Sequence, residues 1–323
     1  MFRYLARRLL WAGVLLLAVT VVTYVIFFLV PANPARLAAG QSATPERIRE
    51  VEEFLGLNEP VYVQYGKFLE RLALHGELGH SFITRRSVND DIYDAAPVTA
   101  SLVFGGMILV LLIAVPIGIF SALRPRSLID RAAMTYVLIG ISLPSFWIAL
   151  VLSYVIGYKL QWTPIATYCE VFSPPEAIGC GGLRDWAYHM ILPWTALSIV
   201  IAGSYVRFVR AEVLETMTQD YVRTARAKGA PERRVMTRHI LRNGMLPVVT
   251  MLGMDIGLLL GGAIFIETVF ALPGLGRTAI LSVSTFDLPL LQGVVIFGAV
   301  AIIIFNLLVD IVYAWIDPRI RLA

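Results

Sequence analysis

Charged residues are scarce in this chain of 323 residues. They make up 15% of it, whereas a typical water-soluble domain carries about 25%. Apolar residues make up 58%, and the mean hydropathy is +0.73. This composition excludes an ordinary soluble domain and is typical of an integral membrane protein. The net charge of +4 does not indicate a nucleic-acid partner, because the basic residues lie beside apolar runs, where membrane topology explains them.

Residues that hold metals or nucleotides are also few. The sequence contains no Gly-x-x-x-x-Gly-Lys-Ser/Thr phosphate loop, so we expect no ATP site of that kind in this chain. Its four histidines are scattered, and no pair has the spacing of metal ligands. We therefore expect no catalytic residues, no metal site and no cofactor in the chain itself.

The only two cysteines are Cys169 and Cys180, in the 159–189 segment. If this segment lies outside the cytoplasm, the oxidising compartment favours a disulfide between them. Closing a loop of about a dozen residues would stabilise the fold by roughly 3 kcal/mol. Free thiols and a metal-binding pair are the alternatives.

Long apolar runs dominate the rest of the chain. A membrane-spanning helix needs about 20 mostly apolar residues. The first run is too long for the apolar part of a signal peptide, so we interpret it as a retained span. The sequence predicts an all-α membrane protein with six spans, at roughly 9–30, 99–123, 134–158, 190–210, 245–268 and 290–313.

Lysine and arginine are unevenly distributed between these runs. The N-terminal residues and the 124–131 loop hold three each, and the 207–242 loop holds nine against four acids. The 31–98 segment holds seven, but long loops cross the membrane largely regardless of charge, so the short segments decide. We expect both termini and the 207–242 loop on the cytoplasmic side. The expected outside segments are 31–98, 159–189 and 269–289.

The first outside segment has helical patterns of its own. "TPERIREVEEFLG" (44–56) opens with a Thr cap and a Pro, and "VQYGKFLERLALHG" (63–76) has a helical period and a Gly stop. We expect a folded lid or docking surface, with a plain connector as the alternative. The predicted organisation is residues 1–98, the first span with this extracytoplasmic region, followed by a permease core at 99–323.

The basic cytoplasmic loop contains "DYVRTARAKGAPERRVMTRHILRN" (220–243). Residues from Met217 to Lys228 favour a helix. Gly229 fits the left-handed position after a helix, and Pro231 fits the first turn of the next one. The sequence predicts two short helices that meet at a tight break. Basic residues kept only for topology or lipid contact are the alternative.

This loop resembles the cytoplasmic loop of permease subunits in ATP-binding-cassette (ABC) importers, specifically the B-type subunit of the dipeptide, oligopeptide and nickel group. Gly229 matches the family's glycine. Residues 223–225 stand where Glu-Ala-Ala is usual, and only Ala225 is kept. His239, Leu241 and Arg242 stand where Ile, Leu and Pro are usual, departures that the peptide subgroup shares. Further stretches follow in the family's order, namely "FRYLARRLL", "VPANPARLAAG", "LGLNEPVYVQY", "GELGHS", "ISLPSFW", "HMILPW", "ETVFALPGLGR" and "NLLVDIVYAWIDPRIR".

The resemblance implies a type I ABC importer permease fold in the cytoplasmic (inner) membrane of a bacterium or archaeon. It implies a second homologous permease, two ATPase subunits that bind ATP and Mg, an extracytoplasmic substrate-binding protein, and a peptide substrate moved by alternating access. Membrane lipid would surround the pair. The coupling loop would be 207–247, and its ATPase-docking residues would be Glu215, Asp220, Tyr221, Arg223, Thr224, Ala225, Lys228 and Gly229.

One ionisable residue stands near the middle of the predicted fifth span. An unpaired Asp255 at that depth would cost roughly 3 kcal/mol or more, so it should face the bundle or an aqueous path. We expect it in the translocation path, where it would meet a peptide's amino group or gate passage. A structural bond to polar groups of the neighbouring subunit is the alternative. Glycines at 253, 257, 261 and 262 permit close helix approach, and we interpret their face as a contact with the second permease or the pathway wall.

Other functions remain as alternatives. A nickel or other small-substrate importer belongs to the same class. An ion-coupled secondary transporter would carry inverted repeats and several intramembrane charges, whereas this sequence shows one clear mid-span charge and no internal repeat. A membrane anchor or sensor would leave the basic helix pair without a partner.

Overall fold

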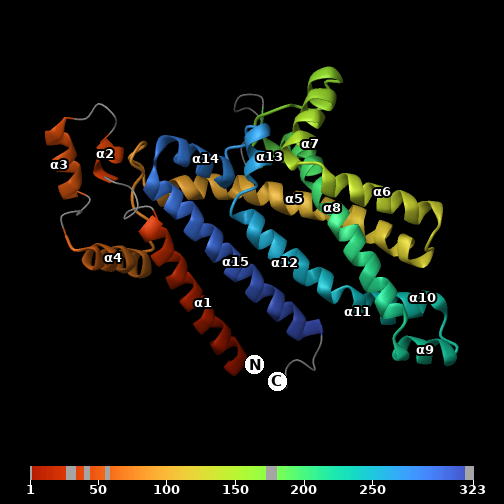
Figure 1. The fold of residues 1–323 in the computed structure, drawn as a ribbon. Helices are drawn as coiled ribbons and strands as arrows, with labels where there is room; N and C mark the ends of the chain where they lie inside the picture. The colour runs from red at the N-terminus through yellow and green to blue at the C-terminus, as the bar shows by residue number, and fades with distance from the viewer. Residues whose placement is uncertain (1, 27–33, 40–43, 55–58, 172–179, 317–323) are drawn as a thin grey trace. The chain divides into compact units, whose positions relative to one another are not determined.

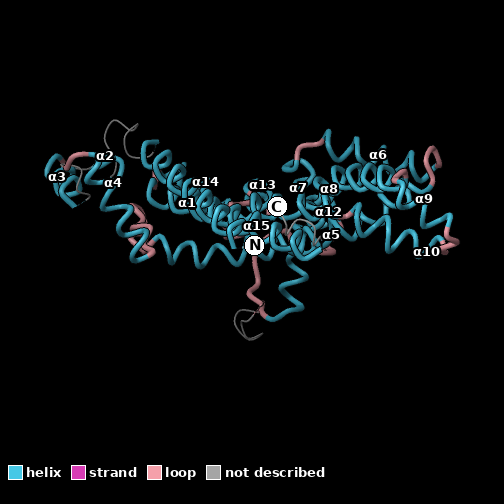
Figure 2. Tube along the Cα trace, turned by 90° about the horizontal axis from the view of Figure 1, so that it is seen from below, coloured by secondary structure: helices cyan, strands magenta, loops and turns pink. Residues whose placement is uncertain are grey.

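The structure is a computed structural model of the whole chain, and it describes residues 2–26, 34–39, 44–54, 59–171 and 180–316. The described residues are mainly helical, and no β-strand occurs among them (Figures 1 and 2). The C-terminal residues 317–323, which are expected on the cytoplasmic side, lie outside them, as do residues 30–33, 40 and 55–58 of the family-like stretches. The α-helices are α1 (Phe2–Tyr24), α2 (Pro34–Ala39), α3 (Pro45–Phe54), α4 (Val61–Glu70), α5 (Val88–Leu123), α6 (Leu128–Ser142), α7 (Ser145–Leu152), α8 (Gly182–Met217), α9 (Asp220–Ala227), α10 (Glu232–Arg234), α11 (Arg242–Gly244), α12 (Leu246–Leu260), α13 (Ile264–Val269), α14 (Leu275–Thr285) and α15 (Leu288–Ile316). The π-helical stretches 71–75, 153–159 and 235–241 continue α4, α7 and α10.

The chain forms two compact units that do not follow its linear order. Unit 1 comprises 1–99, 257–264 and 273–304, and unit 2 comprises 100–256, 265–272 and 305–323. Each unit is a set of residues that contact one another, and each combines several separate stretches of the chain. The division expected at residue 98 stays a prediction.

Unit 1 packs the segment before α5 against α1 and α15. Tyr24 of α1 and Phe68 of α4 lie against Ile296 of α15 in a buried cluster. The Tyr24 hydroxyl donates to the Gln64 side chain at 3.0 Å. The Gly stop predicted for this helical stretch is confirmed, since Gly76 takes a left-handed conformation with φ of 66°.

A second set of bonds in unit 1 holds the hairpin before α5. Asp287, 2% exposed, accepts from the Ser81 hydroxyl and from the Phe82 N–H, the latter at 3.0 Å. Asn89 donates to the Gly76 carbonyl at 2.7 Å. The described part of 59–98 is therefore a folded element rather than a loose connector.

Unit 2 is built on three long helices, α5, α6 and α8, which cross one another closely (Figure 1). A Cβ at Gly106 or Gly118 of α5 would lie 2.6 or 2.7 Å from Leu197 or Val209 of α8. Gly140 of α6 would likewise meet a carbonyl of α8 at 3.1 Å. Only residues without a Cβ allow helices this near, which is a common device in membrane bundles.

Four helices are long and apolar enough to cross a membrane within the described residues: α1, α5, α8 and α15. Two bent pairs raise the number to six if each pair is one span. The first pair joins α6 to α7 with a bend of 103°, and the second joins 232–244 to α12 with a bend of 43°. The prediction of a multi-pass helical protein is borne out, but the spans are less regular than their apolar runs suggested.

Two predicted helices are wrong in detail, and a third bends sharply at its proline. The 134–158 run is not straight, because Pro144 has no N–H to donate and forces Leu143 into an extended conformation (φ −96°, ψ 132°). The 245–268 run breaks after Leu260, where Gly262 has φ of 127°, outside the helical region. The expected helix 217–228 is interrupted by extended Gln219 (ψ 145°), so α8 ends and α9 begins there.

Candidate functional site

The basic loop folds into a defined element at the end of α8. Residues 218–244, called here the basic segment, contain α9, α10, a π-helical stretch and α11. Val222, Val235 and Ile240 are fully buried in it. A Cβ at Gly244 would lie 3.0 Å from the Thr216 hydroxyl and 3.4 Å from the Glu212 carbonyl, so the segment returns against the last turns of α8. This packing makes the segment an extension of α8 rather than a free loop.

The tight break predicted at Gly229 is present. Gly229 has φ of 78°; its N–H donates to the Arg226 carbonyl at 2.9 Å, and the Ala230 N–H donates to Ala225 at 3.2 Å. These two bonds are the Schellman pattern that closes a helix with a left-handed glycine. Pro231 lies one position earlier than expected, as the residue that precedes α10.

One ion pair crosses this break. Arg226 Nε donates to Glu232 Oε1 at 2.8 Å. Both side chains are substantially exposed, so solvent screens the pair and it contributes little to stability. The pair links the end of α9 to the start of α10.

The eight residues expected to dock an ATPase lie on α8, α9 and this break. Seven are exposed and Ala225 is half-buried, while Val222 turns inward between them. The Asp220 side chain is 98% exposed and that of Arg223 is 71% exposed. The element thus combines a buried apolar side with an outer side that is open within this chain.

Asp255 on α12 has a specific partner in unit 2. The Tyr205 hydroxyl of α8 donates to its Oδ2 at 2.7 Å, and the Tyr205 residue is fully buried. Asp255 itself remains half-exposed in the single chain. The position of Asp255 was predicted, but Tyr205 was missed, because a tyrosine in an apolar run carries no sequence signal for such a bond.

The close helix approach predicted for the α12 glycines is present, but at three of the four positions the neighbour belongs to this chain rather than to a second permease. A Cβ at Gly253 would lie 1.9 Å from Val309 of α15 in unit 2. In unit 1, Gly261 lies against Gly298 of α15, and Gly262 lies against Gly276 of α14. These glycines accommodate helices of the same chain, because backbones meet where no side chain intervenes.

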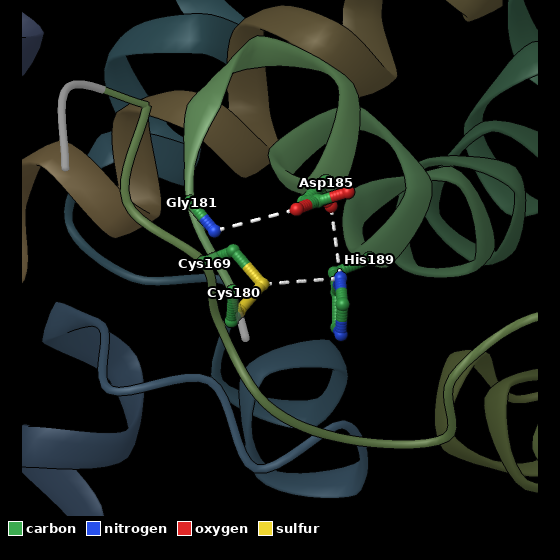
Figure 3. Close-up of a disulfide and its surroundings, with 5 residues drawn as sticks. All are labelled: Cys169, Cys180, Gly181, Asp185 and His189. Atoms are coloured by element: carbon green, nitrogen blue, oxygen red, sulfur yellow. Dashed lines mark hydrogen bonds between the residues drawn. A yellow bond between two sulfur atoms is a disulfide. The ribbon is translucent and has the colours of Figure 1, made fainter. Parts of the chain in front are cut away.

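Cys169 and Cys180 form a disulfide in unit 2 (Figure 3). Nδ1 of His189 lies 2.8 Å from the Asp185 carbonyl oxygen and 3.1 Å from Cys169 Sγ. Since a carbonyl only accepts, Nδ1 carries the proton. Residues 172–179 of this loop lie outside the described part of the chain.

These residues are also the one group of potential metal ligands among the described residues. Cys169, Cys180 and His189 place one ligand atom each within 4.8 Å of the others. Both sulfur atoms are bonded to each other, and metals bind the thiolate form, so the site is not available to a metal in this state. The sequence did not indicate that His189 would lie here, 20 residues from Cys169.

Comparison with known proteins identifies the family. Residues 114–322 match the binding-protein-dependent transport system inner membrane component, and residues 1–103 match the N-terminal component of the same systems. The chain belongs to this family of membrane permeases, and the resemblance stated from its motifs is confirmed.

Curated relatives match over almost the whole chain. The dipeptide transport system permease protein DppB of Alkalihalophilus pseudofirmus is 36% identical, over 99% of this chain and 100% of its own. The glutathione transport system permease protein GsiC of Salmonella paratyphi A is 37% identical, over 99% of both chains. The all-helical permease fold and the role as an ABC importer permease follow from this likeness; the site residues stay predictions.

Proposed function

We propose that this chain is the permease subunit of an ATP-driven importer of di- or oligopeptides. It pairs with a second homologous permease, and the path runs between them. Two ATPase subunits bind ATP and Mg and hydrolyse the nucleotide, so this chain contributes no catalysis. A substrate-binding protein delivers the peptide at the outer face. Family membership supports this assembly, and the relatives' names favour a peptide over nickel.

The observation that carries the proposal is the architecture of the basic segment. Its residues Val222, Val235 and Ile240 are buried, its Gly244 lies against the last turns of α8, and the predicted docking residues are exposed except for half-buried Ala225. A loop kept only for topology requires neither a buried core nor a Schellman break. A partner that presses on α9 would push a rigid extension of α8, which is the lever that rigid-body alternating access needs.

The orientation belongs to the same proposal. The basic segment carries most of the lysine and arginine near α8, so it lies on the cytoplasmic side with both termini. The folded 59–98 element and the disulfide loop then lie outside, where an oxidising compartment keeps Cys169 and Cys180 bonded. Both elements are available to the binding protein.

Asp255 is proposed as a contact of the translocation path. One oxygen of its carboxylate accepts the hydrogen bond from Tyr205, and the other oxygen can accept a bond from a second partner. A peptide's ammonium group is a suitable partner, because a charge-assisted hydrogen bond would compensate for burying both charges. Tyr205 would orient the carboxylate.

Substitution of Gly229 tests the docking role. Apart from the two chain neighbours of Gly229, no atom of the described residues lies within 4 Å of a Cβ at this position, so a Trp there is expected to meet a partner rather than its own fold. We expect Gly229→Trp to lose the ATPase subunits on co-purification while the second permease stays bound.

Two controls separate steric bulk from backbone strain. Gly229→Ala carries the same left-handed strain, about 1–2 kcal/mol, without the bulk and should retain the ATPases. Gly76→Trp has a similar φ of 66° and equally open surroundings in unit 1, and should also retain them. If Gly229→Trp retains the ATPases and peptide-stimulated hydrolysis, the basic segment is topological and the docking role is wrong.

A further inference from the structure

A buried polar cluster in unit 2 joins α5, α6 and α8 outside the sites described above. Asp130 is 6% exposed and Ser121 is fully buried. Arg210 donates to both carboxylate oxygens of Asp130, from Nε at 2.8 Å and from Nη2 at 3.2 Å. The Ser121 hydroxyl donates to Oδ1, and the Arg126 N–H donates to Oδ2 at 2.8 Å. Each oxygen of Asp130 therefore has two donors.

The turn between α5 and α6 is shaped to serve this carboxylate. Arg126 has φ of 63°, a left-handed conformation that is uncommon for a residue with a Cβ. This conformation directs its N–H at Asp130. Ser127 caps α6, and its hydroxyl accepts from the Asp130 N–H at 3.2 Å. The turn, the helix start and the carboxylate thus hold one another in a single geometry.

Arg210 lies where α8 continues toward the basic segment. It precedes the end of α8 at Met217 by about 10 Å of helix. The segment packs on this same stretch, at Glu212 and Thr216. On the other side of Arg210, Val209 packs against Gly118 of α5. The ion pair therefore lies between the basic segment and the body of the three-helix group.

Stability alone does not account for this cluster. A buried ion pair can often be replaced by apolar side chains without loss, and such side chains are abundant here. What a bidentate pair adds is one fixed register between the helices that carry it. A fixed register between α6 and α8 at this position would make the two helices move together when α8 is displaced.

We propose that the Asp130–Arg210 pair is a positioning device of the transport cycle, which makes α5 and α6 follow α8 when the ATPases displace the basic segment. The inference rests on the proposed function, since it needs an ATPase-driven displacement. Without the pair, displacement of the basic segment would move the cytoplasmic end of α8 but would not move α5 and α6 with it. ATP would still be hydrolysed, but less peptide would be moved for each ATP.

The first test measures this ratio in proteoliposomes that hold the complete complex and its binding protein. We expect Asp130→Asn to lower peptide moved per ATP by at least about fivefold, the lower range of coupling between distant sites. Arg210→Gln should do the same, and the double variant should be no worse than either single change. Arg131→Gln removes an exposed charge from the same turn of α6 and serves as the matched control, with an unchanged ratio.

The second test reads motion directly and does not depend on transport. One spin label is attached at Arg124→Cys, beside the cluster, and a second at Thr237→Cys, in the basic segment. The distance between the two labels is measured in the complex. This distance should stay constant between the nucleotide-free and ATP-trapped states, and should change between them once Asp130→Asn is added. The disulfide leaves no native thiol to label among the described residues.

Two results would overturn the inference: an unchanged ratio in Asp130→Asn, or a label distance that already changes in the unsubstituted protein. A thermal destabilisation of Asp130→Asn with the ratio intact would assign the pair a structural role only. Failure of the proposed function is distinguishable, because then the unsubstituted complex would itself bind no ATPases or move no peptide.

Discussion

The bond between Tyr205 and Asp255 is the clearest single-residue feature of the predicted path. It joins α8 and α12 within unit 2, and it gives the Asp255 carboxylate a hydrogen-bond donor. An ionisable residue within a membrane span is by default a hypothesis for a functional site, because placing a charge there is costly. Two predictions belong to this scale.

Asp255→Asn should lower transport of peptides with a free amino terminus and leave N-acetylated peptides nearly unaffected. The change removes the negative charge that we propose for the ammonium contact, and about 1.5–3 kcal/mol of charge-assisted bonding corresponds to a tenfold or larger loss. Uptake of labelled peptides, compared in pairs with and without the N-acetyl group, measures this loss.

Tyr205→Phe should show a weaker form of the same selectivity. Tyr136→Phe, which removes a hydroxyl bond of 3.1 Å to the Ile199 carbonyl, is the matched control. Equal losses for both kinds of peptide would make Asp255 a structural residue.

Removal of the disulfide should destabilise the loop that holds Cys169 and Cys180. Cys169→Ser combined with Cys180→Ser should lower the free energy of unfolding by about 3 kcal/mol, because the open loop gains entropy in the unfolded chain. Thermal unfolding with and without a dithiol reductant checks this. The reductant should lower the Tm of the parent protein to that of the variant and leave the variant unchanged. The prediction would be contradicted if the reductant left the Tm of the parent protein unchanged although a thiol assay showed that the disulfide had been reduced.

At the scale of elements, close helix crossings determine how unit 2 packs. Gly106 and Gly118 bring α5 onto α8, Gly140 brings α6 onto α8, and Gly253 brings α12 onto α15. Each crossing depends on the absence of a side chain on one helix. The elements therefore tolerate little added volume at these positions.

Gly253→Ala tests the tightest crossing in this group, since its Cβ would lie 1.9 Å from Val309 Cγ2. We expect a loss of about 1–3 kcal/mol from overpacking, measured by thermal unfolding of the purified complex. Adding Val309→Ala should recover part of it by making room. Gly66→Ala in α4, where nothing lies within 4 Å, is the control and should be neutral or slightly stabilising. A Gly253→Ala variant as stable as the parent would show that the two helices separate freely.

At the scale of the whole molecule, orientation in the membrane decides which surface meets which partner. The proposal places the basic segment with the ATPases and the folded 59–98 element with the binding protein. Both contain exposed positions suited to labelling, Thr237 in the first and Tyr62, 78% exposed, in the second.

A membrane-impermeant thiol reagent checks this arrangement on intact cells. We expect Tyr62→Cys to react before the cells are opened and Thr237→Cys to react only afterwards, because the charge bias retains the basic loop in the cytoplasm. Denatured samples of both variants, which should label equally, serve as the control. The reverse pattern would invert the topology and exclude contact between the basic segment and cytoplasmic ATPases.

The sequence by itself determined the membrane class, the approximate helices and the break at Gly229. These features depend on local properties: apolar length, the missing Cβ of glycine, and the distribution of lysine and arginine. The family-like stretches added the permease identity, which the comparisons confirmed. The docking role of the eight loop residues stays a prediction.

Only the tertiary structure decided which side chains meet across the fold. Tyr205 and Asp255 are separated by 50 residues, and Asp130 and Arg210 by 80. Such pairs depend on how far each helix is rotated and where it crosses its neighbour, and no local pattern encodes either quantity. The same reason assigned the α12 glycines to α14 and α15 of their own chain.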